Sequence, residues 1–132
     1  LEGAIGLEQL EKLPKFIDQR QKNGDQFRIA MSEHPDIIIQ KEIGKSSWFG
    51  FSLIVRPESK LTRPNLIKEL TSLGFESRPI VAGNFAESEA MKYLDYEIPY
   101  PLKNAAHVHS NGLFIGNHHF PMDEAIQKIK NL

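Results

Sequence analysis

The spacing of apolar residues in the first quarter of the chain is typical of helices. Such residues recur at Ala4, Ile5, Leu7, Leu10 and Leu13. Pro14 is compatible only with the first turn of a helix, because proline has no amide N–H to donate within a helix interior. The pattern therefore predicts two helices, over residues 2–13 and 14–32, with a bend between them.

Two strands are predicted next. The run HPDIIIQKEI contains a β-branched trio after a proline-bounded turn, and SSWFGFSLIVRP alternates residue types until Pro57. In the second half of SSWFGFSLIVRP, apolar residues occupy both alternating sets of positions. This favours a strand that is buried on both faces.

A helix and a further strand follow. In LTRPNLIKELTSLGFE, Thr62 has the properties of an N-cap, Pro64 suits the first turn, and Gly74 is typical of a helix end. ESRPIV then predicts a strand, which completes a strand–helix–strand unit. The segment ESEAMKYL is expected to be helical, and a loop rich in Pro and Asn, the strand NGLFIGN and the helix DEAIQKIKNL complete the chain.

These elements predict an α+β fold. We expect a small two-layer sandwich, in which a three- or four-stranded, mainly antiparallel sheet is covered by helices on one face. Residues 1–132 form a single domain, with an entering helix pair over residues 1–32 and an α/β sandwich over residues 33–132. The chain starts without Met and directly in helical composition, so we expect it to be cut from a longer protein.

Composition excludes several classes of function. A formal net charge of −1, from 16 basic and 17 acidic residues, provides no field that would gather nucleic acid or an anionic membrane. The sequence contains no cysteine, no signal peptide, and no apolar run near the roughly 18–20 residues that span a bilayer. We expect a cytoplasmic protein that binds neither nucleic acid nor membranes.

The histidines do not make a convincing metal site. Two pairs, His107 with His109 and His118 with His119, lie in the last quarter of the chain. Zinc needs three or four converging ligands, and the chain offers neither cysteines nor a nearby acidic pair. We therefore expect no metal, and favour His118 as a residue of a substrate pocket. No nucleophile elbow and no phosphate-binding loop is present either, so we assign no catalytic residue.

The stretch ESRPIVAGNF is the strongest candidate for a binding site. Arg78 precedes Pro79, which stiffens the backbone beneath a guanidinium suited to phosphate or carboxylate. Gly83 permits a sharp turn, and Asn84 can both donate and accept hydrogen bonds. From the residues alone, a strand end with a turn and a surface salt bridge explains the pattern slightly better than a binding site does. Composition likewise favours Trp48 as a core residue.

Four segments resemble the sugar aminotransferase and dehydratase family of pyridoxal phosphate enzymes, which have the aspartate aminotransferase fold. They are GAIGLEQLEKLPKFIDQRQKN, SSWFGFSLIV, RPIVAGNF and NGLFIGNHH, and the resemblance covers essentially the whole chain. It is a resemblance to the C-terminal domain of these enzymes. The Ala-Gly-Asn sequence is similar to the 3-dehydratase branch, and SSWFGF with RPIV favours its GDP-linked members.

The resemblance implies a homodimeric enzyme whose N-terminal domain holds pyridoxal phosphate or pyridoxamine phosphate. In the dehydratase branch a histidine of that domain replaces the Schiff-base lysine, and the C3 hydroxyl leaves a 4-keto-6-deoxy sugar nucleotide used for O-antigen deoxysugars such as colitose. By itself, this chain is expected to bind no cofactor and to be inactive. The resemblance implies substrate contacts at Arg78, Asn84, Phe85, Trp48 and His118.

Two alternatives remain at this stage. A sugar 4-aminotransferase differs by having a lysine at the Schiff-base position, which lies outside this chain. A free-standing α+β module that binds a small ligand or a partner would also fit a sandwich of this size. Because a domain cut from its parent exposes former contacts, we also expect self-association, through the first helix or the strand that carries Trp48.

Overall fold

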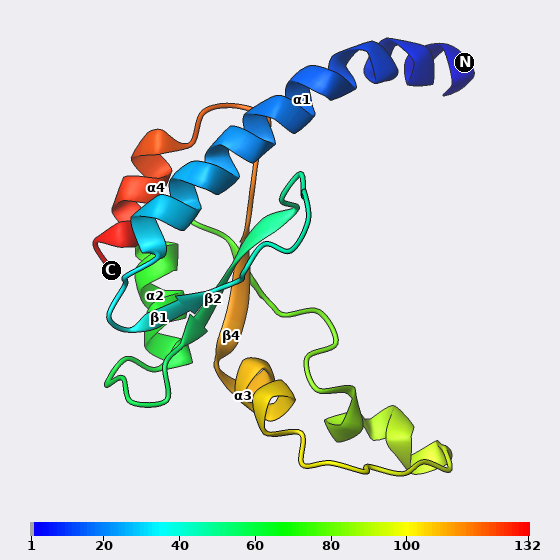
Figure 1. Ribbon diagram of the computed structural model, residues 1–132, viewed down its shortest axis with the longest axis vertical. Helices are drawn as coiled ribbons and strands as arrows, with labels where there is room; N and C mark the ends of the chain where they lie inside the picture. The colour runs from blue at the N-terminus through cyan, green and yellow to red at the C-terminus, as the bar shows by residue number, and fades with distance from the viewer. Residues whose placement is uncertain (1) are drawn as a thin grey trace.

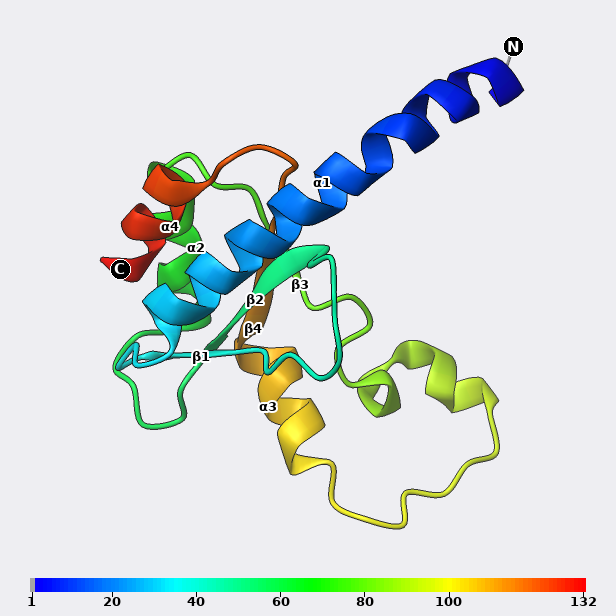
Figure 2. The ribbon, with the colours of Figure 1, turned by 45° about the horizontal axis from the view of Figure 1, so that its top comes forward.

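The computed structural model describes residues 2–132 and has two layers, with a long helix crossing the sheet and an arm extending from one end of it (Figures 1 and 2). In chain order the elements are α1 (Glu2–Met31), β1 (Ile37–Ile39), β2 (Gly50–Val55), α2 (Arg63–Ser72), β3 (Ser77–Pro79), the 3-10 turns η1 (Phe85–Glu87) and η2 (Glu89–Tyr93), α3 (Lys103–Asn111), β4 (Gly112–Gly116) and α4 (Asp123–Lys130). The predicted α+β class is confirmed.

The four strands form one open sheet in the order β1-β2-β4-β3, and every neighbouring pair is antiparallel. Leu53 of β2 pairs with Leu113 of β4, and both are buried. The next positions, Ser52 and Phe114, also pair with each other but are only half-buried. One face of the sheet is therefore covered and the other is open, so the prediction that β2 is buried on both faces was wrong.

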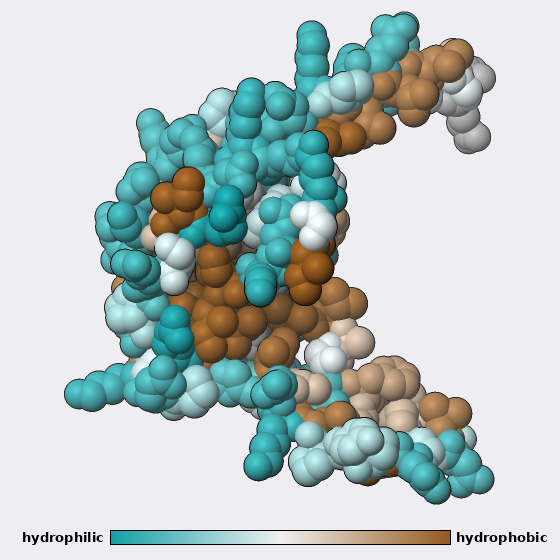
Figure 3. All heavy atoms as spheres, in the orientation of Figure 1, coloured by the Kyte–Doolittle hydropathy of each residue, from teal (hydrophilic) through white to brown (hydrophobic). Residues whose placement is uncertain are grey.

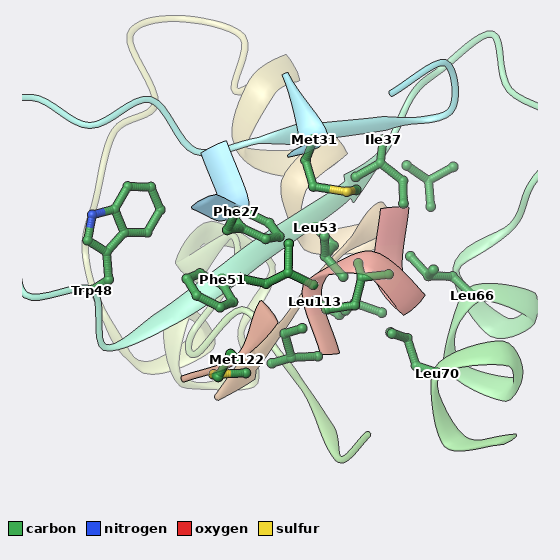
Figure 4. Packing of buried hydrophobic residues seen from close by; sticks show 14 residues of the cluster. Phe27, Met31, Ile37, Trp48, Phe51, Leu53, Leu66, Leu70, Leu113 and Met122 are labelled. Carbon is green, nitrogen blue, oxygen red and sulfur yellow. The ribbon is translucent and has the colours of Figure 1, made fainter. Parts of the chain in front are cut away.

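The core lies between the covered face and α1, α2 and α4. Figure 4 shows how side chains from these layers interdigitate. The buried apolar residues are Phe27, Met31, Ile37, Trp48, Phe51, Leu53, Val55, Leu66, Leu70, Leu113, Ile115, Met122, Ile126 and Ile129. The rings of Phe27 and Phe51 stack with their centroids 4.3 Å apart, which links α1 to the middle of the sheet.

Helix α1 runs through Pro14 without interruption, so the prediction of two helices was wrong. Pro14 removes one backbone hydrogen bond, but it lies on an exposed stretch where water can solvate the carbonyl left without a partner. The N-terminal half of α1 extends beyond the sheet (Figure 1). Ile5, Leu7, Leu10 and Leu13 in this extension are between 45% and 70% exposed. Figure 3 shows apolar side chains along its edge that faces the hollow beside the arm.

Helix α3 forms where a loop was predicted. Its nine residues, KNAAHVHSN, contain no residue that is fully buried, so the apolar pattern by which a helix is recognised in a sequence is missing. Contacts with other elements stabilise it instead. The Nε2 atom of His107 lies 2.9 Å from the carbonyl oxygen of Val55, at the end of β2, and Arg63 of α2 donates to the carbonyl of His109.

Helix α2 follows its prediction closely. Thr62 is the N-cap and its hydroxyl accepts a hydrogen bond from the amide of Asn65. Pro64 lies in the first turn, and Gly74, which ends the helix, has a φ of +86°.

The limits of two strands differ from the prediction: β2 begins only at Gly50 and β3 ends at Pro79. The backbone turns close to each of these ends, where Trp48 and Val81 have positive φ angles.

The short turn after α1 contains a buried histidine. His34 is 7% exposed, and its Nδ1 atom accepts a hydrogen bond from the amide of Asp36. Burial lowers the pKa of His34, because the charged imidazolium loses hydration there. The neutral ring can therefore act as the acceptor that fixes the turn between α1 and β1.

A network of two buried carboxamides joins α1 to the end of β4. The Nδ2 atom of Asn23 lies within 3.0 Å of the side-chain oxygen of Asn117 and of the carbonyl oxygens of His118 and Phe120. Asn117 in turn donates to the carbonyls of Arg20 and Trp48, both at 3.0 Å. Asn23 is completely buried and Asn117 is 6% exposed, so these hydrogen bonds form with little competition from water.

The backbone at Trp48 is strained and held from several sides. Its φ of +49° is unusual for a residue other than glycine. Asn117 and Arg20 both bind its carbonyl oxygen, and the hydroxyl of Ser46 accepts a hydrogen bond from its amide. Its indole packs against Gly24 so closely that a Cβ atom added there would lie 2.6 Å from the ring.

We expect Gly24→Ala to lower the free energy of unfolding by about 1–3 kcal/mol, because the added methyl group overlaps the Trp48 ring. Urea titration of the chain, followed by the fluorescence of its single tryptophan, measures this. Gly6→Ala is the matched control in the same helix, with nothing within 4 Å of the new Cβ atom. It should leave stability unchanged or raise it by up to about 1 kcal/mol through helix propensity. Equal effects of both substitutions would contradict the packing described.

We expect Asn117→Ala to lower the free energy of unfolding by about 1–3 kcal/mol, because it removes one acceptor of Asn23 and the carboxamide that donates to the carbonyls of Arg20 and Trp48 within a buried network. The same titration applies. The control is Asn104→Ala on the exposed side of α3, which should change stability by less than about 0.5 kcal/mol. An Asn117→Ala chain as stable as the control would show that the network contributes nothing.

Candidate functional site

An open groove of about 970 Å³ lies at the end of the sheet where β3 begins and β4 ends. Its walls come from the turn between α2 and β3, from the open face of β4, and from the first turns of α4. Arg20 of α1 and Phe49 also line it, so parts of the chain that are distant in sequence meet at this groove. It contains two of the predicted site residues, Arg78 and His118.

Arg78 lies on the open face of the sheet, because it pairs with Phe114 of β4. Its guanidinium makes an ion pair with Glu76, at 3.0 Å from Nη2, in which the side chains are 70% and 79% exposed. Such an exposed pair contributes little to stability and is easily exchanged for another anion. The surface salt bridge anticipated from the sequence is present, and it leaves the guanidinium accessible from the groove.

The other charged side chains of the groove are balanced and partly engaged. Arg20 donates to the carbonyls of Ser47 and Trp48, and Asp123 accepts a hydrogen bond from Gln26. The cations lining the groove are Arg20, Arg78 and Lys128, and the acids are Glu76, Asp123 and Glu124. Recognition of an anion here would thus depend on the local position of Arg78 rather than on a field from the whole groove.

Aromatic rings form much of the remaining wall. Phe49 is 79% exposed and lies 6.0 Å, centroid to centroid, from Phe114. The ring of His118 stacks on Phe120 at 4.6 Å with an angle of 17° between the planes. The analysis of the sequence missed Phe49, Phe114 and Phe120 as groove residues. Only the strand register places Phe114 beside Arg78, and the sequence contains no signal for that pairing.

Asn84 and Phe85 do not line this groove. Asn84 is 6% exposed, and its side chain donates to Glu87 at 2.6 Å. Phe85 begins η1 and is 54% exposed. The structure therefore separates these residues into a groove set, Arg78 and His118, and a turn set, Asn84 and Phe85, which follows the C-terminal end of β3. Their roles in binding stay a prediction.

Trp48 has a third location, in the core. It is 2% exposed, and its ring contacts those of Phe27 and Phe51. This matches the alternative that composition favoured. The neighbouring Phe49, rather than Trp48, presents its ring to the groove.

His107 and His109 lie in helix α3. Across residues 2–132, no three His, Asp or Glu side chains come together in a way that could hold a metal ion. Among the helices described, none has the length and hydropathy needed to cross a bilayer.

Comparison with known proteins gives consistent results. The chain is 47% identical over 133 aligned residues to the GDP-4-keto-6-deoxy-D-mannose 3-dehydratase of Yersinia pseudotuberculosis. This alignment covers 100% of the chain and 34% of the relative. The solved structure of Escherichia coli GDP-4-keto-6-deoxy-D-mannose-3-dehydratase with bound hydrated PLP is 44% identical. It matches with a TM-score of 0.89 over 98% of this chain and 33% of its own.

A crystal structure of a GDP-4-keto-6-deoxymannose-3-dehydratase mutant with bound GDP-perosamine is also 44% identical, with a TM-score of 0.90 over 98% of this chain and 34% of its own. The chain thus spans about a third of the length of the curated relatives it matches. Residues 1–131 match the sequence model of the DegT/DnrJ/EryC1/StrS aminotransferase family. The chain belongs to the DegT/DnrJ/EryC1/StrS aminotransferase family.

Proposed function

We propose that this chain is the C-terminal domain of a sugar-nucleotide 3-dehydratase that depends on pyridoxal phosphate or pyridoxamine phosphate. The full-length enzyme would remove the C3 hydroxyl of GDP-4-keto-6-deoxymannose for the synthesis of O-antigen deoxysugars such as colitose. It would act as a cytoplasmic homodimer.

One observation carries this proposal. The similarity to 3-dehydratases, at 47% identity over 133 aligned residues, extends over the whole chain, and the 14 buried apolar residues of the described core (Figure 4) are too few to account for it. Positions outside the core therefore match as well. Matches outside the core favour a shared ligand over a merely shared fold.

Within the full-length enzyme, the open face of the sheet is the surface best suited to face the substrate. It presents a guanidinium, the rings of Phe49 and Phe114, and no covering helix. A guanidinium fork binds phosphate or carboxylate through two parallel hydrogen bonds. In our proposal Arg78 orients an anionic group, His118 lies near it in the groove, and Asn84 and Phe85 contact the substrate from the turn after β3.

The residues described here do not by themselves form a cofactor site. A cofactor phosphate needs several converging donors, whereas Arg20 is engaged with backbone carbonyls and Arg78 is the remaining arginine of the groove. When bound, a pyridoxal-type cofactor supplies an electron sink for the reaction. We assign its ligands, and the proton-transferring histidine, to the part of the enzyme outside this chain.

Dimerisation is supported by apolar surface. The four exposed large apolar side chains of the α1 extension, Ile5, Leu7, Leu10 and Leu13, would find a partner in a second subunit or in the rest of the enzyme. The second contact that we considered, association through the strand next to Trp48, would need an unpaired edge on β2. β2 has no such edge, because β1 and β4 pair with it on its two sides. α1 thus remains the proposed contact.

The direct test is an assay of the full-length protein with GDP-4-keto-6-deoxymannose and either pyridoxamine phosphate or pyridoxal phosphate with an amino donor, because the amino form of the cofactor supplies the two electrons that the reaction needs. We expect replacement of the C3 hydroxyl by hydrogen, detected by mass spectrometry of the sugar nucleotide. Transfer of an amino group to C4 in its place would support the sugar 4-aminotransferase alternative. Absence of both reactions, with tight binding of some other small ligand, would support a binding module.

Arg78→Lys should raise KM for the sugar nucleotide by about tenfold or more, because lysine keeps the charge but loses the two-pronged hydrogen bonding. Steady-state kinetics of the full-length enzyme measure this. Glu76→Gln is the control: it removes the partner of Arg78 but keeps the guanidinium, so KM should stay the same or fall slightly. If Arg78→Lys leaves KM unchanged, Arg78 is not a substrate contact.

A further inference from the structure

A hydrogen bond joins the two ends of the long excursion between β3 and β4. The backbone amide of Asn84 donates to the Nδ1 atom of His109 at 3.2 Å, although the two residues are 25 positions apart. Between them lie η1, η2, the extended segment of residues 94–102 and most of α3. In Figures 1 and 2 this part of the chain forms an arm that leaves the sheet and returns to it. The Asn84–His109 contact closes the base of the arm.

The turn beside this contact is strained. The amide of Gly83 donates to the carbonyl of Ile80 at 2.7 Å, which defines a tight turn. Within it, Val81 has a φ of +23°, a conformation that a β-branched residue adopts only when its surroundings impose it. Val81 is 89% exposed, so its own side chain cannot supply that constraint. The constraint must come from the residues that flank it.

His109 is the side chain that packs most closely on this turn. A Cβ atom added to Gly83 would lie 2.2 Å from the Nδ1 atom of His109, so the ring occupies the space above the glycine. Glu87 lies beside both partners: its Oε1 accepts a hydrogen bond from the side chain of Asn84 at 2.6 Å, and its Oε2 lies 3.9 Å from the Nε2 atom of His109. Arg63, the first residue of α2, donates a hydrogen bond to the backbone carbonyl of His109.

These contacts fix the role of each ring nitrogen. Nδ1 faces an amide N–H and must accept, while Nε2 faces a carboxylate and carries the proton. The turn therefore requires a hydrogen-bond acceptor at the position of Nδ1. A side chain without such an acceptor leaves the backbone amide of Asn84, a residue that is 6% exposed, without its partner.

We propose that His109 is a positioning residue: through Nδ1 it holds the turn of residues 80–84, and through the turn it fixes the direction of Arg78. Strand β3 has only three residues and one neighbour, β4, and its last residue, Pro79, cannot donate to the sheet. The turn is thus the second anchor of the strand that carries the guanidinium. The link to Arg78 rests on the proposed function, whereas the link to the turn does not.

The test compares three substitutions in the full-length protein. His109→Asn places a carboxamide oxygen close to the position of Nδ1, His109→Gln places it close to Nε2, and His109→Leu supplies no acceptor. Hydrogen exchange of the Asn84 amide should accelerate about tenfold in the Leu and Gln variants and return close to the wild-type rate in the Asn variant. Asn104→Ala, an exposed change on the same helix, is the control and should not alter this rate.

Kinetics give the second readout. KM for GDP-4-keto-6-deoxymannose should rise about five- to tenfold in the Leu and Gln variants, with kcat within about twofold of wild type, and the Asn variant should restore KM. Equal exchange rates for the Asn84 amide in the Leu and Asn variants would overturn the role of His109, whatever the activity. An altered exchange rate with unchanged KM would overturn the link to Arg78. The expected exchange pattern in a protein without dehydratase activity would support the role in the turn and count against the proposed function alone.

Discussion

The pairing of two carboxamides, Asn23 in α1 and Asn117 after β4, is the constraint on which the rest of the domain depends. Both are buried, and a buried polar group without partners would destabilise the fold substantially. Their donors and acceptors are satisfied only when α1, the carbonyl of Trp48 and the segment after β4 meet at one point. The network therefore determines where α1 crosses the sheet, and it specifies one arrangement in a core that is otherwise apolar.

The same network connects the core to the groove. On its inner side, the indole of Trp48 packs between Gly24 and the stacked rings of Phe27 and Phe51. On its outer side, the chain continues into Phe49 and His118, which line the groove. Residues that look like candidates for binding and residues that stabilise the fold are thus adjacent in sequence but separated by the backbone. This is why composition alone could not assign Trp48 and Phe49 to different roles.

Elements with local signals were predictable from the sequence, and those stabilised from a distance were not. The N-cap at Thr62, Pro64 and the glycine at position 74 define α2 without reference to the rest of the chain. Helix α3 lacks such signals, and its contacts come from Val55 and Arg63, far away in sequence. At Pro14 a sound local rule failed, because an exposed helix can lose one hydrogen bond to water and still continue. The candidate site follows the same division: Arg78 was found through its own sequence context, whereas Phe114 became part of the groove only through strand pairing.

The closed base of the arm has a consequence for how this domain can vary. Once the Asn84–His109 contact has joined the two ends, lengthening the segment between them costs little, because loop-closure entropy grows only slowly with length. The segment of residues 94–102 contains no regular element and has exposed apolar residues, including Tyr96 and Tyr100. Insertions, deletions and exchanges there can be accommodated without shifting the register of β3 against β4. The arm is accordingly the part of the domain where evolution can change what the molecule touches while the sheet keeps its shape.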